Sequence, residues 1–149
     1  MIEENTHNVN IDKILKENFK GYQVSNDPYE KVAVYSRGGI IGIISYSIIY
    51  ERAEINYIIV TDPNRHNGIG SNLLEFALAD IVKHNCQVIS LEVEEGNLPA
   101  INLYLKYGFI KKALRENYYK NKNAILMVKE LRWKYGNIYF SNWIKLWWN

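Results

Sequence analysis

The sequence is poor in the features that mark secreted and membrane-spanning proteins. Its 149 residues include one cysteine, Cys86, which excludes an intramolecular disulfide and fits a reducing compartment. The longest stretch without a charged side chain, residues 38–50, is 13 residues long and too short to cross a bilayer as a helix. The N-terminus begins with acidic and polar residues and holds no apolar signal core. We therefore expect a cytoplasmic chain with no transmembrane segment.

A strong charge imbalance and clusters of metal ligands are also lacking. The formal net charge is +2, and no long basic run precedes residue 132, so the charge pattern indicates no nucleic-acid partner. The histidines His7, His66 and His84 are scattered and lack the spacing of a metal site, so we expect no metal. There is no G-x-S-x-G motif and no Cys/His pair at a recognisable spacing, which argues against a nucleophilic hydrolase.

The composition that remains is that of one globular domain. Hydrophobic residues make up 48% of the chain and charged residues 23%, and we expect a single domain over residues 1–149. Residues 132–149 differ from the rest, because they hold all four tryptophans and no acidic residue. Two interpretations of this extension stay open: a terminal element that packs its tryptophans on a sheet, or an interfacial or partner-binding helix.

The order of apolar and turn residues predicts a mixed α/β or α+β sheet domain. Antiparallel strands come first, and a strand–helix–strand–helix–strand order follows. An apolar stripe predicts a helix that begins near Gly68, and Asn97 with Pro99 opens another helix that Gly108 closes. The expected helices are residues 12–19, the helix from residue 68 and residues 97–108; the expected strands are residues 31–35, 40–50, 54–60, 87–93, 113–119 and 124–131.

Two glycines, Gly68 and Gly70, stand at the start of the second of these helices. Glycine permits a tight turn and a close approach of backbone N–H groups to a ligand, and a helix N-terminus favours an anion. The dinucleotide motif would need a third glycine at Leu73, and the P-loop would need Lys-Ser or Lys-Thr where Ser71-Asn72 stands. These glycines alone therefore predict either an anion-binding turn or a loop that they merely shape.

Three polar side chains follow in the second half of the chain. Glu92 lies mid-strand among apolar residues, and it is either exposed on a one-sided sheet or partly buried with a pKa raised towards that of a general base. Asn97 and Tyr104 fall on one face of a helix and would point at one ligand. The structural alternatives are an N-cap for Asn97 and core packing for Tyr104.

Taken together, these segments carry a family resemblance. The strand that ends in residues 58–60 is followed by RHNGIG (65–70), LEVEEGN (91–97) and NLPAINLYLKYGF (97–109). This order resembles the GCN5-related N-acetyltransferase (GNAT) superfamily and, within it, the RimI-like branch of ribosomal-protein-alanine N-acetyltransferases. The resemblance covers roughly residues 31–131. It implies a mixed, mostly antiparallel sheet that is flanked by helices and splayed between its fourth and fifth strands.

The resemblance also implies a donor site for acetyl-CoA as co-substrate. The backbone of Ile58, Ile59 and Val60 would pair with the pantetheine arm, and Asn97 would contact the same arm. The backbone N–H groups of the glycine turn would hold the pyrophosphate. The residues implied in this turn are Arg65, His66, Asn67, Gly68, Ile69, Gly70 and Ser71.

The implied chemistry is direct attack of a primary amine on the thioester, with Glu92 as general base and Tyr104 as general acid. The acceptor that the resemblance favours is the N-terminal α-amine of a protein, in the first place a ribosomal protein. At pH 7 an α-amine is about 15% neutral, whereas a lysine amine is about 0.04% neutral. A small-molecule amine such as an antibiotic, a polyamine or an amino-acid derivative is the alternative, and a non-catalytic acyl-CoA-binding module is a third. A homodimer is left open.

Overall fold

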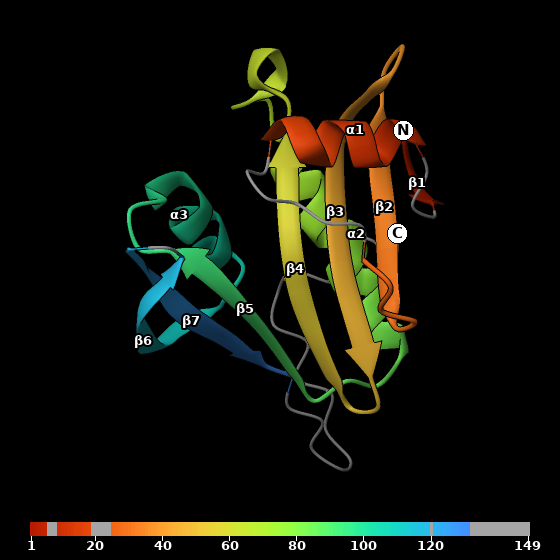
Figure 1. The fold of residues 1–149 in the computed structure, drawn as a ribbon. Coiled ribbons are helices and arrows are strands. Elements are labelled where there is room, and N and C mark those ends of the chain that lie inside the picture. Colours follow the sequence, from red (N-terminus) through yellow and green to blue (C-terminus); the bar gives the residue numbers. More distant parts are fainter. Residues whose placement is uncertain (6–8, 19–24, 120, 132–149) are drawn as a thin grey trace.

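The computed structural model describes residues 1–5, 9–18, 25–119 and 121–131. These residues form one seven-stranded sheet with helices on both faces (Figure 1). In chain order the elements are β1 (Ile2–Asn5), α1 (Val9–Asn18), β2 (Glu30–Ser36), β3 (Ile40–Ile49), β4 (Arg52–Val60), the 3-10 helix η1 (Asp62–Asn64), α2 (Ile69–Lys83), β5 (Val88–Glu94), α3 (Leu98–Lys106), β6 (Ile110–Tyr119) and β7 (Lys122–Glu130).

The sheet opens at its centre. Its strand order is β1-β2-β3-β4-β5-β7-β6, and every neighbouring pair is antiparallel except β4 and β5. These two strands pair in parallel from Arg52 opposite Val88 to Ile55 opposite Leu91, and then they separate. Figure 1 shows β4 and β5 diverging from this short paired segment. The splay between the fourth and fifth strands is thus confirmed.

The helices bury their apolar stripes on opposite faces of the sheet. The stripe of α2 packs on one face together with α3, and Leu73, Leu74 and Ala77 in it are fully buried. Helix α1 covers part of the other face with Ile11 and Leu15. Because burying one such aliphatic side chain stabilises the fold by about 1.5–3 kcal/mol, these two stripes explain why both helices dock.

A bulge in β4 changes which face its residues occupy. Ser45 of β3 is opposite Tyr57, but the next residue of β3, Tyr46, is opposite Ile55, so Asn56 is an extra residue in β4. Ile55 therefore packs in the core beneath α2, whereas Tyr57 packs against the cluster beneath α1. The bulge lies next to the point at which β4 leaves β5.

The expected elements are present, with differences at their ends. Strand β6 begins at Ile110 instead of residue 113, because register shifts after Lys111 interrupt its alternation. Helix α1 begins at Val9, before the expected capping residue Asp12. Strand β1 is not among the expected elements, because IEEN has no apolar alternation and pairs with a strand far along the chain. Both interpretations of residues 132–149 concern residues outside the described ranges.

Candidate functional site

The separated ends of β4 and β5 are the first part of the site. Beyond Ile55, residues 56–60 of β4 pair with β3 alone among the described strands, so the edge that faces β5 has no strand partner. The side chain of Ile59 is buried beneath α1, and those of Ile58 and Val60 pack towards α2. The backbone of the expected pantetheine segment therefore lines an opening within the sheet.

The glycine turn follows directly from this strand. Gly68 is the N-cap of α2 with a φ of 75°, and His66 two residues earlier has a φ of 63°. Both angles are left-handed, a conformation that glycine adopts without cost and that costs other residues roughly 1–2 kcal/mol. Gly68 has no side chain with which to cap the helix, and the first N–H groups of a helix have no acceptor within it. The turn therefore presents backbone donors at a positive helix end.

Gly70 brings the start of α2 close to its neighbours. A Cβ atom at this position would lie 3.7 Å from Cδ2 of Leu103 in α3 and 3.9 Å from Cγ2 of Val60 in β4. The glycine turn, the end of β4 and α3 thus meet at one place. Gly42 in β3 has a tighter role, because a Cβ there would lie 2.9 Å from Cγ2 of Ile69. Sequence reasoning missed Gly42, which stands in an apolar strand without a turn signal.

Arg65 stabilises the turn from its N-terminal side. Its Nε donates to the carbonyl oxygen of Val60 at 3.1 Å, and its Nη1 lies 2.8 Å from Oδ1 of Asp62. The guanidinium of this expected cofactor residue thus holds β4 and η1 together. Asn67, another residue of the turn, donates from Nδ2 to the carbonyl oxygen of Asn64 at 3.5 Å.

Glu92 lies in β5 at the opening. Its side chain is 11% exposed and forms an ion pair with Nη1 of Arg115 in β6, whose side chain is 51% exposed. Because Leu91 and Val93 are buried against α3, strand alternation directs Glu92 to the sheet face that carries α1. The sequence leaves an exposed and a partly buried position open for this carboxylate, and the structure has the buried position.

Asn97 and Tyr104 belong to α3, on the other side of β5. Asn97 is the N-cap, and its Oδ1 accepts from the backbone N–H of Ala100 at 3.3 Å. Tyr104 is 6% exposed and packs edge-on against Phe109, with 5.7 Å between ring centroids. The structure thus contains both structural alternatives, the cap and the core tyrosine. Glu92 and Tyr104 lie on opposite faces of β5.

Helix α3 is fastened to α2 by a second tyrosine. The hydroxyl of Tyr107 donates to Oε1 of Glu75 at 2.5 Å, and burial, with this carboxylate, raises the pKa of Tyr107 to about 12. On the other side of Tyr107, Nζ of Lys129 donates to its carbonyl oxygen at 2.8 Å. These contacts fix the helix that carries Tyr104 relative to α2 and β7.

A polar network that sequence reasoning missed crosses the α1 face of the sheet. Ser45 and Ser47 of β3 are buried, and Nδ2 of the bulge residue Asn56 donates to their hydroxyls at 2.9 and 3.1 Å. Ser45 donates in turn to Glu30, and Ser47 donates to Oδ2 of Asp27 at 2.8 Å. The alternation of Ser45 and Ser47 within an apolar strand is the one signal in the sequence that points to this network.

Glu54 lies on the same face, between that network and Glu92. It stands opposite Ser90, and partial burial, followed by the negative charge of Glu92, raises its pKa above the ordinary value. Nothing in the sequence pattern relates Glu54 to Glu92, since only the register of β4 and β5 brings them to one face.

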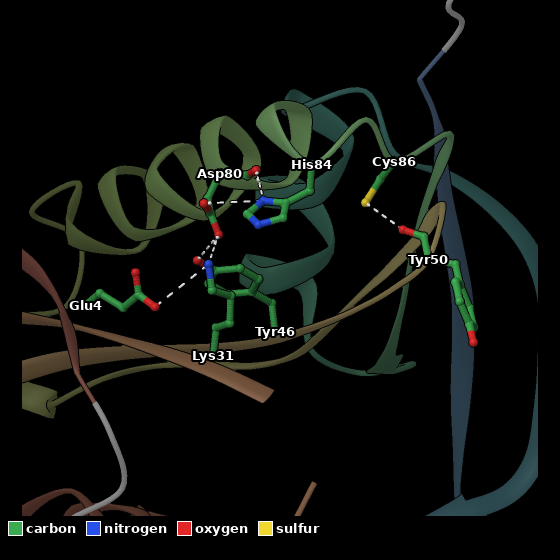
Figure 2. Close-up of polar contacts among 7 residues, drawn as sticks. All are labelled: Glu4, Lys31, Tyr46, Tyr50, Asp80, His84 and Cys86. Carbon is green, nitrogen blue, oxygen red and sulfur yellow. Dashed lines mark hydrogen bonds and ion pairs between the residues drawn. The ribbon is translucent and has the colours of Figure 1, made fainter. Parts of the chain in front are cut away.

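A separate charged cluster lies near the far end of α2 (Figure 2). Oδ2 of Asp80 accepts from Nζ of Lys31 at 2.7 Å and from the hydroxyl of Tyr46 at 2.9 Å. Burial acts to raise the pKa of Asp80, but the hydrogen bonds from Lys31 and Tyr46 outweigh it and hold the pKa below its ordinary value. Burial and Asp80 raise the pKa of Tyr46. We call Asp80, Lys31, Tyr46 and His84 the Asp80 cluster.

Three further observations concern metal ligands, membrane-spanning helices and the cysteine. Within the described ranges, no group of three or more His, Cys, Asp or Glu side chains has the arrangement to hold a metal ion. No helix in these ranges is long and apolar enough to cross a membrane. Cys86 is fully buried in the core, and burial raises the pKa of its thiol.

Comparison with known proteins gives the family. Residues 4–109 match the model of the acetyltransferase (GNAT) family. A Bacillus subtilis protein named as a candidate alanine N-acetyltransferase for ribosomal protein bS18 is 28% identical over 109 residues, which are 71% of this chain and 72% of that protein. Human N-alpha-acetyltransferase 30 is 33% identical over 81 residues, which are 54% of this chain and 22% of the human protein. The chain therefore spans about a fifth of the length of that human relative.

The fold also matches that of a solved acetyltransferase structure. The crystal structure of the ribosomal-protein-S18-alanine N-acetyltransferase from Escherichia coli superposes with a TM-score of 0.77 and 21% identity, covering 94% of this chain and all of that chain. At this identity the likeness concerns the fold. Since the family match alone takes in more than half of the residues, this chain belongs to the GNAT acetyltransferase family.

Proposed function

We propose that this chain is an acetyl-CoA-dependent N-acetyltransferase whose acceptor is the N-terminal α-amine of a protein, with a ribosomal protein as the leading candidate. The observation that carries the proposal is the opening between β4 and β5, which lies beside the glycine turn at the start of α2. The names of the similar proteins, which include N-alpha-acetyltransferases, support this acceptor class.

The donor half of the proposal uses backbone groups. The N–H groups of residues 66–71 bind the pyrophosphate, because the left-handed residues His66 and Gly68 turn successive donors towards one anion. The edge of residues 58–60 that pairs with none of the described strands binds the pantetheine arm, and an N–H group there faces the thioester carbonyl. One such donor aimed at a developing oxyanion contributes about 3–4 kcal/mol in enzymes from which it was removed. Oδ1 of Asn97 is engaged in the cap of α3. The contact of this side chain with the pantetheine arm is therefore made by its NH2 group.

The chemical step needs one proton acceptor and one proton donor. The amine nitrogen attacks the carbonyl carbon, the C–N bond forms, and the C–S bond breaks with departure of the CoA thiolate. Glu92, directly or through a water, takes the proton that the nitrogen loses. Tyr104 gives a proton to the sulfur, so that CoA leaves as the thiol; between the free groups this transfer runs uphill by about 1.5 pKa units, because a phenol has a pKa near 10 and a thiol one near 8.5. No covalent intermediate with the protein forms.

The acceptor half rests on charge and on the state of the amine. An α-amine is favoured over a lysine amine by roughly 3–4 kcal/mol before the enzyme acts, because far more of it is neutral at pH 7. The sheet face beside the opening carries Asp27, Glu30, Glu54 and Glu92. These carboxylates attract the protonated amine to the site before it is deprotonated.

A CoA-thiol release assay tests this function. Purified protein is given acetyl-CoA with peptides that have a free α-amine, with the same peptides blocked at the α-amine but carrying lysine, and with small amines. We expect turnover with the free α-amine peptides and little with the blocked ones. Turnover with small amines alone would favour the small-molecule alternative. Binding of acetyl-CoA without turnover of any amine would contradict both and favour an acyl-CoA-binding module.

Two further proposals come from the sequence alone: a cytoplasmic location, supported by the single cysteine, and the organisation of residues 1–149 as one domain. The homodimer that the sequence leaves open needs a measurement of its own. Size-exclusion chromatography with light scattering tests the homodimer, and a monomer at micromolar concentration would contradict it.

A further inference from the structure

The ion pair between Arg115 and Glu92 spans three strands. In register, Glu92 of β5 is opposite Leu126 of β7, and Arg115 of β6 is opposite Ala124 of the same strand. The guanidinium therefore reaches across β7 beside a small side chain, Ala124, to the carboxylate at the opening. A register shift follows Arg115 in β6, and its guanidinium also lies 5.7 Å from the ring of Tyr118.

Glu54 faces the same pair from β4. It is opposite Ser90, two residues before Glu92 on the same face of β5. Glu54 and Glu92 are thus diagonal neighbours on one sheet face, where long side chains of adjacent strands can interact. Glu54 is also the last residue on this face of β4 before the strands separate. Burial is the largest cause of the raised pKa of Glu54; the charge of Glu92 raises it further and that of Arg115 opposes the rise, which agrees with this placement.

We propose that Arg115 is a positioning residue for Glu92, and that its guanidinium holds this carboxylate at the opening and balances the combined negative charge of Glu92 and Glu54. The inference rests on the proposed function, in which Glu92 accepts the proton of the amine. Other charged groups on this face are Asp27 and Glu30, which accept from the serines of the polar network, and the ion pair of Glu94 with Lys122, at 2.6 Å.

The arrangement has a consequence for the acidic limb of the pH–rate profile. Two neighbouring carboxylates without a cation repel each other, so one of them keeps its proton to a higher pH. Loss of Arg115 therefore moves the acidic limb of kcat/KM to higher pH, and loss of Glu54 moves it to lower pH. If either residue had a merely structural role, its loss would lower the melting temperature or the maximal rate, and the midpoint of the acidic limb would stay in place.

The experiment compares pH–rate profiles of four variants in the full-length chain with acetyl-CoA and a turned-over amine. Arg115→Gln raises the midpoint of the acidic limb by about one pH unit, and Arg115→Lys restores most of the wild-type midpoint because it keeps the charge. Glu54→Gln lowers the midpoint by a smaller amount. The control is Lys111→Gln, which removes a positive charge from an exposed position of β6 that is in register with Met127, on the opposite face. This control leaves the midpoint unchanged.

Glu92→Gln separates this inference from the proposed function. If Glu92→Gln keeps the wild-type rate and limb, the role of Glu92 in the proposed function is wrong. If Glu92→Gln loses activity while Arg115→Gln and Glu54→Gln keep the wild-type midpoint, the inference is overturned and the proposed function stands. Should Arg115→Gln fail to fold, carbon-13 NMR titration of the Glu92 carboxyl in wild type, Arg115→Lys and Glu54→Gln decides. An unchanged Glu92 titration in Glu54→Gln then overturns the inference.

Discussion

Two charged clusters in this molecule use similar side chains and differ in what surrounds them. The Asp80 cluster closes on itself, because Lys31 and the Tyr46 hydroxyl both donate to one carboxylate between α2 and the sheet (Figure 2). Glu92 and Arg115 form their ion pair where β4 has left β5. A carboxylate paired with a cation thus becomes a candidate site when the sheet opens beside it, and it remains a structural tie when the sheet is closed.

The same contrast runs along helix α2. Its first turn begins at Gly68 beside the opening, and Asp80 lies in its last turns, roughly 15–20 Å away at 1.5 Å per residue. One helix therefore presents backbone donors at one end and is anchored to β2 and β3 at the other. Anchoring the distant end keeps the first turn in place without occupying it.

The largest effect that separates the two clusters is on turnover. Glu92→Gln and Tyr104→Phe are each expected to lower kcat by about 100-fold or more, the usual scale of general acid–base catalysis. Steady-state rates with a turned-over amine and saturating acetyl-CoA measure this effect. Unchanged rates in both variants would assign both residues to the core and leave the opening without its proposed chemistry.

The next effect is on stability and belongs to the other cluster. Asp80→Asn removes the charge that two largely buried donors share, and it is expected to lower the free energy of unfolding by about 2 kcal/mol. Urea unfolding measures the loss. Because the cluster is distant from the opening, kcat at a temperature where the variant is folded should match wild type. A kcat reduced as strongly as in Glu92→Gln would break the distinction between the clusters.

Two glycines sharpen the comparison within the opening itself. Gly42→Ala places a Cβ 2.9 Å from Ile69, and it is expected to lower the free energy of unfolding by about 1–2 kcal/mol.

Gly70→Ala makes only ordinary van der Waals contacts, so it is expected to leave the free energy of unfolding within about 1 kcal/mol of wild type. Its expected effect is a raised KM for acetyl-CoA, because a methyl group would intrude where, in the proposed function, a backbone N–H approaches the pyrophosphate. Thermal unfolding and the KM for acetyl-CoA measure the two effects, and an unchanged KM in Gly70→Ala would count against the pyrophosphate site.

The smallest effects differ in the sign of their pH dependence. The pKa of Asp80 is lowered on folding, so its stabilisation is present above its ordinary value of 3.8 and is lost as pH falls through the folded value. The pKa of Glu54 is raised on folding, so its favourable contribution is present below its ordinary value of 4.5 and is lost as pH rises through the folded value. Melting temperatures measured between pH 3 and 7 should therefore show that the difference between wild type and Asp80→Asn becomes smaller towards acid. The melting temperature of Glu54→Gln should rise relative to wild type only at higher pH. The same pH trend in both variants would contradict the opposite directions of the pKa shifts of Asp80 and Glu54 on folding.

The sequence predicts the repeating parts of this fold better than its charged pairs. The stripe of α2, the N-cap Asn97 and the left-handed Gly68 are local features, and local periodicity or a single residue type predicts them. Glu54, Arg115 and the Asn56 bulge depend on strand register, which no local pattern specifies. Strand β1 could not be predicted for the same reason, since its short polar sequence forms a strand only by pairing with β2.

Arg65 shows how a correct motif can leave a side chain unassigned. The motif predicts the turn that the structure contains, yet the guanidinium contacts Val60 and Asp62 within the protein. A pattern of residue types specifies the backbone conformation here, whereas the partners of a long side chain depend on the strand and the 3-10 helix around it.

Amide hydrogen exchange with and without acetyl-CoA tests the central claim most directly, because it compares both ends of α2 in one sample and needs no acceptor. The account predicts that acetyl-CoA slows exchange at residues 58–60 and 66–71, at the opening and the glycine turn, and leaves the amides around Asp80 and His84 unchanged. Protection centred on the Asp80 cluster, or binding of acetyl-CoA without protection at the glycine turn, would contradict it.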